Sequence, residues 1–173
     1  MSPLTYIICW PLFMAVLLAF VPRNYRVVLR AGALFATLLS LLVAVKMFLQ
    51  FNGAEAGVGG YKFVQQVSWI ESLGISYFVG VDGINVGLIL MGALVAFAAA
   101  CVSWEIKQRE KEFYILLLVM TGGILGAFAS LDLFFFYFFH ELALVPTFIM
   151  IGVWGRGTVR NFATFQITMY LTV

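Results

Sequence analysis

Continuous apolar runs of about 20 residues dominate this sequence, and their length constrains the fold more than any other feature. Of the 173 residues, 64% are hydrophobic and 10% are charged, which is more apolar surface than a soluble domain of this size can bury. The runs do not alternate between polar and apolar residues, as the strands of a membrane barrel do. Helices are the remaining way to satisfy a backbone in lipid, so we predict an all-α integral membrane protein.

The apolar runs predict five complete transmembrane helices and the start of a sixth near Val159. The five helices are expected at Leu4–Val21, Val27–Phe51, Asp82–Trp104, Phe113–Ser130 and Asp132–Trp154. The stretch from Phe113 to Gly155 would measure about 65 Å as one helix, twice the hydrocarbon thickness of a bilayer. We therefore expect a turn between Ser130 and Asp132.

Lysine and arginine residues fall mainly on one side of the predicted spans. That side carries Arg23, Arg26, Arg30, Lys107, Arg109, Lys111, Arg156 and Arg160, whereas Lys46 and Lys62 belong to the other side. The positive-inside rule then puts the N-terminus outside the cytoplasm. The formal net charge is only +2, and neither a basic patch for nucleic acid nor an acidic tail is present.

One long external loop, residues 52–80, joins the second and third spans. Within it, Tyr61–Val67 and Ile75–Val79 are expected to pair as a short hairpin at the lipid interface, which Trp69 also favours. At the other end of the sequence, Arg160–Val173 would form only about 21 Å of helix, which is too short for a full span. We therefore expect the chain to be the N-terminal part of a longer protein.

Glu141 is the strongest candidate for a functional residue. It lies about halfway along the predicted fifth helix, where a carboxyl group costs several kcal/mol unless it is used. Burial favours the neutral form and a nearby cation favours the charged form, so a carboxyl between these two influences can load and release a proton. The alternative is a neutral glutamic acid that hydrogen-bonds between helices.

Two neighbours of Glu141 bear on this hypothesis. Pro146 removes a backbone hydrogen bond and clashes with the carbonyl of Leu142, so the helix should bend or open just beyond Glu141. His140 is the only histidine, and it is either a second proton relay or a polar anchor against another helix. With a single histidine the chain cannot ligate a haem through two of its own imidazoles, and two distant cysteines, Cys9 and Cys101, cannot hold an iron–sulfur cluster, so we expect no redox centre or other cofactor in this chain.

Other polar and small residues of the spans are expected to have structural roles. Asp82 and Asp132 are expected to cap the third and fifth helices, because an acidic group at a helix N-terminus accepts free N–H groups. Gly122, Gly126 and Ser130 form a small-residue stripe that should let another helix approach the fourth span closely.

Three motifs together resemble a known family. The Gly80-Val-Asp-Gly83 motif, the His140-Glu-Leu-Ala-Leu-Val-Pro146 core and the Trp154-Gly155 ending resemble subunit M, an antiporter-like membrane subunit of bacterial respiratory complex I, NADH-quinone oxidoreductase. The resemblance implies a 14-helix protein of the bacterial inner membrane with two inverted five-helix repeats. Residues 1–112 would then be an N-terminal three-helix segment, and residues 113–173 the beginning of the first repeat.

The resemblance also implies a function. Subunits of this kind translocate protons while partner subunits, which carry NADH, FMN, iron–sulfur clusters and quinone, perform the electron transfer. Glu141 matches the glutamate that pairs in this family with a lysine on a later helix, for which this chain has no counterpart. His140 stands where relatives often have tryptophan, so the resemblance gives it no role. The alternative function is that of a subunit of a multisubunit sodium/proton antiporter.

Overall fold

A computed structural model describes residues 2–155, 157 and 160–172, so Arg156 and Val159 lie outside the described residues. Its six helices are α1 (Pro3–Phe20), α2 (Arg26–Gln50), α3 (Asn85–Val102), α4 (Glu110–Ala129), α5 (Leu133–Trp154) and α6 (Arg160–Thr172). Two strands, β1 (Lys62–Ile70) and β2 (Ile75–Val81), pair antiparallel, with Gln66 opposite Phe78 and Ser68 opposite Ser76. The predicted hairpin is confirmed and is longer than expected.

Five of these helices are long and apolar enough to cross a membrane, which confirms the predicted spans within the described part of the chain. The bounds of α1, α2 and α5 agree with the prediction to within one residue. The third helix begins at Asn85 instead of Asp82, because Gly83 and Ile84 form a turn before it. The fourth begins at Glu110 instead of Phe113, because the charged residues before its apolar part continue the same helix.

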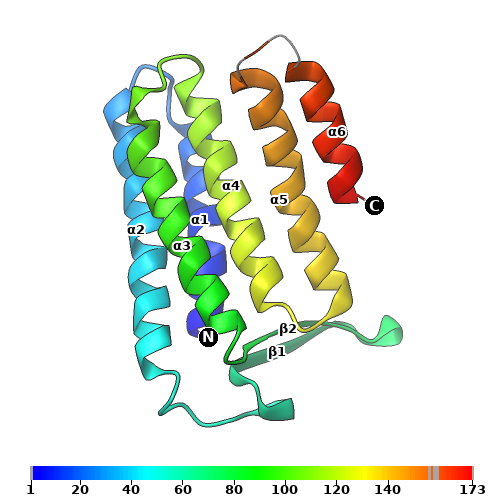
Figure 1. The fold of residues 1–173 in the computed structure, drawn as a ribbon. Coiled ribbons are helices and arrows are strands. Elements are labelled where there is room, and N and C mark those ends of the chain that lie inside the picture. The colour runs from blue at the N-terminus through cyan, green and yellow to red at the C-terminus, as the bar shows by residue number, and fades with distance from the viewer. Residues whose placement is uncertain (1, 156, 158–159, 173) are drawn as a thin grey trace.

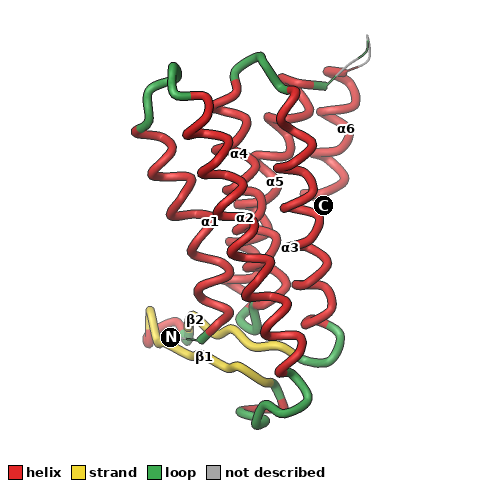
Figure 2. Tube along the Cα trace, turned by 90° about the vertical axis from the view of Figure 1, so that its left-hand side faces the viewer, coloured by secondary structure: helices red, strands yellow, loops and turns green. Residues whose placement is uncertain are grey.

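The helices form a bundle in which each helix packs against at least one other. Helix α1 packs against α2 and α4, α3 packs against α2 and α4, and α5 lies between α4 and α6. The hairpin lies across the end of the bundle that holds the N-terminus (Figures 1 and 2). The loops that follow α1 and α3 lie together at the opposite end (Figure 1).

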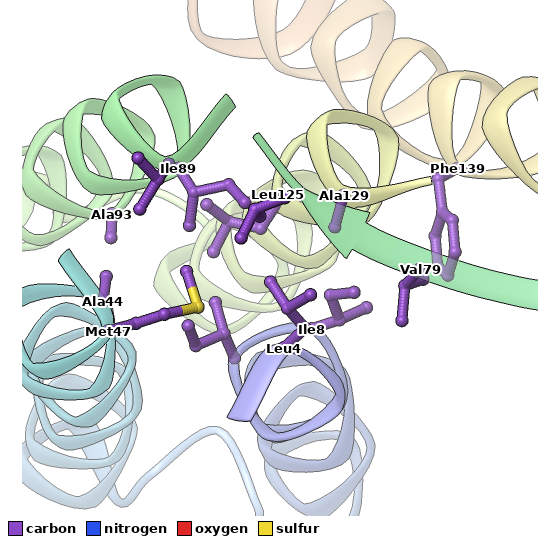
Figure 3. Close-up of a cluster of buried hydrophobic side chains, with 13 residues drawn as sticks. Leu4, Ile8, Ala44, Met47, Val79, Ile89, Ala93, Leu125, Ala129 and Phe139 are labelled. Atoms are coloured by element: carbon purple, nitrogen blue, oxygen red, sulfur yellow. The ribbon is translucent and has the colours of Figure 1, made fainter. Parts of the chain in front are cut away.

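An apolar cluster near the hairpin brings together side chains from distant parts of the chain (Figure 3). It combines side chains of five helices and β2, all at most 5% exposed, including Leu4, Ile8, Ala44, Met47, Val79, Ile89, Ala93, Leu125, Ala129 and Phe139. Other large apolar side chains face outward, such as Phe20 at 82% and Leu133 at 81% exposed. Outward apolar residues are expected where the solvent of a helix is lipid.

Glycines on α4 bring two neighbouring helices close. A Cβ atom on Gly122 would lie 2.6 Å from the Leu12 side chain of α1, and one on Gly126 would lie 2.5 Å from the Phe139 ring of α5. The predicted small-residue stripe therefore serves two helices instead of one. Gly123, which the sequence did not single out, lies nearest to the backbone of another helix, because a Cβ atom on it would lie 2.7 Å from the Ala143 nitrogen.

Candidate functional site

The start of α5 is fixed by Asp132, as the sequence predicts. Its Oδ1 atom accepts hydrogen bonds from the backbone N–H groups of Phe134 at 2.9 Å and Phe135 at 3.2 Å. Its Oδ2 atom also accepts one from the backbone N–H of Ser76 in β2, at 3.4 Å. One carboxylate thus caps the helix and ties it to the hairpin, and only the first of these roles was expected.

Aromatic side chains extend this contact between the hairpin and α5. The Trp69 ring lies 6.0 Å from the Phe134 ring and 5.4 Å from the Phe135 ring, measured between centroids. Tyr77 of β2 meets Phe135 edge to face at 5.4 Å. The Leu131 N–H donates to the Phe78 carbonyl at 2.8 Å, so the α4–α5 turn is held on the sheet as well. These contacts hold the first turn of α5 against the hairpin.

Glu141 follows two turns later on α5. It is about 12 Å along a helix of 22 residues, and its side chain is 37% exposed. The residues that bracket it, Phe139 and Ala143, lie directly against Gly123 of α4. Among the described residues, no lysine or arginine nitrogen lies within 4 Å of its carboxylate. The backbone of Glu141 is thus closely held while its side chain stays open to surroundings outside this segment.

His140 lies beside Glu141 without binding it. The Nδ1 atom of His140 and the Oε1 atom of Glu141 are 3.9 Å apart, which is too long for a hydrogen bond. The imidazole stacks on the Phe136 ring at 6.3 Å between centroids, with the two planes 23° apart. This contact fits an anchoring role, while the relay role stays a prediction.

Pro146 is buried inside α5, and the helix continues through it to Trp154. Because proline has no N–H, it leaves the Leu142 carbonyl without its usual helical donor. The neighbouring Thr147 hydroxyl donates to the Ala143 carbonyl at 2.8 Å. The missing hydrogen bond beyond Glu141 therefore does not interrupt α5.

Asp82 caps the other helix that starts at the hairpin end. Its Oδ1 atom accepts hydrogen bonds from the backbone N–H groups of Ile84 at 2.8 Å and Asn85 at 2.7 Å, and its carbonyl accepts from Val86 at 3.2 Å. These bonds are the ones that a capping carboxylate makes, although the helix itself begins three residues later, at Asn85. Asp82 and Asp132 both precede the apolar part of their helices, whereas Glu141 lies inside the apolar part of α5.

A cluster of ion pairs around the buried Glu110, at the end of the bundle opposite the hairpin, was not predicted from the sequence. Glu110 is only 6% exposed, and its Oε1 atom lies 3.0 Å from Arg30 and 3.5 Å from Arg26. Arg23 pairs with Glu112, and the Arg30 guanidinium lies over the Trp104 ring at 5.2 Å. The arginines after α1 and the glutamates that open α4 were visible in the sequence, but not their pairing.

Comparison with known proteins gives relatives over nearly the whole chain. No family model matches it. The chain is 34% identical over 170 residues to NAD(P)H-quinone oxidoreductase chain 4, chloroplastic, of Chara vulgaris, covering 98% of this chain and 34% of the relative. It is 32% identical over 168 residues to chain 4 1 of the same enzyme from Synechococcus elongatus, covering 96% and 31%. The chain thus spans about a third of the length of these curated relatives.

Solved structures give the same picture. A chain of respiratory complex I from Thermus thermophilus with bound NADH matches with a TM-score of 0.76 and 28% identity, over 97% of this chain and 32% of that one. The membrane-bound sulfane sulfur reductase, an archaeal respiratory membrane complex, matches at 18% identity with a TM-score of 0.69, over 87% and 23%, and supports the fold alone. Nearly the whole chain is therefore similar to about a third of NAD(P)H-quinone oxidoreductase chain 4.

Proposed function

We propose that this chain is the N-terminal part of a proton-translocating membrane subunit of NADH-quinone oxidoreductase, of the subunit M type, in a bacterial inner membrane. The observation that carries the proposal is Glu141, an acidic side chain inside membrane helix α5 whose backbone is held against α4. The similarity of nearly this whole chain to about a third of NAD(P)H-quinone oxidoreductase chain 4 supports the proposal.

Glu141 carries the proton in this proposal. A carboxyl group inside a membrane helix can hold a proton in its neutral form and give that proton up to water when a nearby cation stabilises the carboxylate. A lysine from a later helix of the full-length subunit is the cation, because the described segment supplies none within 4 Å. Movement of that lysine towards and away from Glu141 would release and reload the proton.

Electron transfer lies outside this chain in the same proposal. Partner subunits hold NADH, FMN, iron–sulfur clusters and quinone, and residues 113–173 form the start of the first antiporter-like repeat. The basic end of the bundle faces the cytoplasm, and the N-terminus lies on the opposite side. The names of the relatives favour this enzyme over a multisubunit sodium/proton antiporter.

The test replaces Glu141 in the full-length subunit within its complex. Glu141→Gln keeps the size and removes the titratable group, so NADH-driven acidification of inverted membrane vesicles should be lost, whereas Glu141→Asp should keep part of it. Glu71→Gln, an exposed residue in the hairpin turn, is the matched control and should pump normally.

Assembly is checked by NADH oxidation with a water-soluble electron acceptor, which should be unchanged in every variant. Normal acidification by the Glu141→Gln variant would overturn the role of Glu141. Failure of the full-length protein to co-purify with quinone-reducing subunits would instead favour the antiporter.

A further inference from the structure

A polar pocket of about 190 Å³ lies at the end of the bundle opposite the hairpin. Five basic and two acidic residues line it, and they come from the α1–α2 loop, the α3–α4 loop and the first turns of α2 and α4. We call it the basic pocket. Nothing in the proposed proton path uses these residues.

The acidic residues of the basic pocket are already neutralised. Glu112 pairs with Arg23, and Glu110 pairs with both Arg26 and Arg30. The Lys111 ammonium group donates to the Ala19 carbonyl at 2.8 Å, which satisfies one of its donors and fixes its position.

Two of the five basic residues of the pocket differ from the other three in their contacts. Within the part of the chain that the structure describes, Lys107 and Arg109 have no acidic partner within 4 Å, and both are exposed. Together with the paired arginines they leave the pocket with an excess of positive charge. The ligand that suits this excess is an anion whose oxygens accept several N–H donors at once.

The surroundings of the pocket are those of a membrane interface. The helices that end at the pocket present exposed apolar side chains: Phe20 is 82%, Val27 is 73% and Val102 is 78% exposed. Trp104, 48% exposed, lies at the same level under Arg30. A soluble anion would use the cations alone, whereas a phospholipid would use the cations for its phosphate and these apolar side chains for its acyl chains.

We propose that the basic pocket binds the phosphate group of an anionic phospholipid through Lys107 and Arg109. Arg23 and Arg26 orient the same phosphate group while holding the glutamates. This inference does not depend on proton translocation, because it concerns lipid retention at one end of the bundle. It would make an anionic lipid a structural component that bridges the α1–α2 and α3–α4 loops.

The experiment measures lipid binding to the purified full-length complex by native mass spectrometry, with phosphatidylglycerol and phosphatidylcholine titrated separately. The wild type should retain phosphatidylglycerol in preference to phosphatidylcholine, and added salt should reduce that preference. The test variant combines Lys107→Gln with Arg109→Asn, because Asn adopts the positive φ of 53° found at Arg109 more easily than most residues. Loss of two interfacial cations should weaken phosphatidylglycerol binding about 30-fold.

A charge-matched control variant, Lys46→Gln with Lys62→Gln, removes two cations nearer the hairpin end. It should bind phosphatidylglycerol as the wild type does. Equal retention of the two lipids by the wild type, or unchanged phosphatidylglycerol affinity in the test variant, would overturn the proposal. Displacement of the lipid by an equal concentration of inorganic phosphate would also overturn it, since the pocket would then be a site for a soluble anion.

Discussion

Substitution of Gly123 by alanine tests whether the α4–α5 contact positions Glu141. A Cβ atom on Gly123 would lie 2.7 Å from the Ala143 nitrogen, 2.9 Å from the Phe139 carbonyl oxygen and 3.0 Å from the Leu142 carbonyl carbon. All three are backbone atoms, so no side-chain rotation relieves the clash. An ordinary contact begins at 3.4 Å, so α5 must retreat by about 0.7 Å.

The expected losses of stability and of proton pumping follow from this displacement. Overpacking of a close contact costs about 1–3 kcal/mol of unfolding free energy. Glu141 lies in the helical turn between Phe139 and Ala143, so it moves with them. A shift of about 0.7 Å exceeds the tolerance of about 0.5 Å for a functional side chain, and proton pumping should fall about tenfold or more.

Gly87→Ala provides the control. Gly87 also lies in a helix, α3, and a Cβ atom there would meet nothing within 4 Å. Both variants replace a helical glycine by alanine, so any destabilisation of the Gly123→Ala variant relative to the Gly87→Ala variant is attributed to the clash. The assay is unfolding in mixed micelles by titration with a denaturing detergent, combined with NADH-driven acidification. Equal stability and equal pumping in the two variants would refute the reasoning.

Three further predictions concern the same region. Asp132→Ala should lower stability in the same titration by about 1–2 kcal/mol, since it removes the cap of α5, whereas Asp132→Asn should keep most of it; equal losses would contradict the capping role. Burial raises the pKa of Tyr77 above its ordinary value of 10.0, against a smaller lowering by the hydrogen bond with Thr5. The folded state therefore keeps this proton where the unfolded chain loses it, so stability is present below pH 10.0 and should decline as the pH rises through the folded-state pKa. Tyr77→Phe should reduce that decline, and an unchanged slope would show that another group causes it. His140→Phe preserves ring stacking on Phe136 and removes the imidazole; if His140 is a relay, vesicle acidification should slow severalfold, and an unchanged rate would leave only the anchoring role.

The spans could be predicted because hydropathy is a local property and the bilayer fixes the required length. The bounds of α1, α2 and α5 needed no knowledge of tertiary contacts. The start of α4 was misplaced because Glu110 is charged, and a hydropathy pattern excludes charged residues from a span even when the helix continues through them. The start of α3 was misplaced because the turn at Gly83 lies between the capping carboxylate and the first helical residue.

The candidate site could be predicted only in part. Glu141 stands out in the sequence, since a carboxyl group within an apolar run is unusual wherever it points. What surrounds it could not be predicted, because the close contact of Gly123 with α5 depends on how two helices pack. The bond from Ser76 to Asp132 joins residues 56 positions apart, and the pair of Arg30 with Glu110 joins residues 80 positions apart. Such partners are chosen by the fold, and a single sequence does not specify them.

The double attachment of Asp132 has a mechanical consequence. The same carboxylate binds β2 of the hairpin and caps the helix that carries Glu141. A tilt of the sheet would therefore also displace the first turn of α5. A neighbouring protein that binds the hairpin would therefore also influence the position of Glu141, two helical turns further along α5.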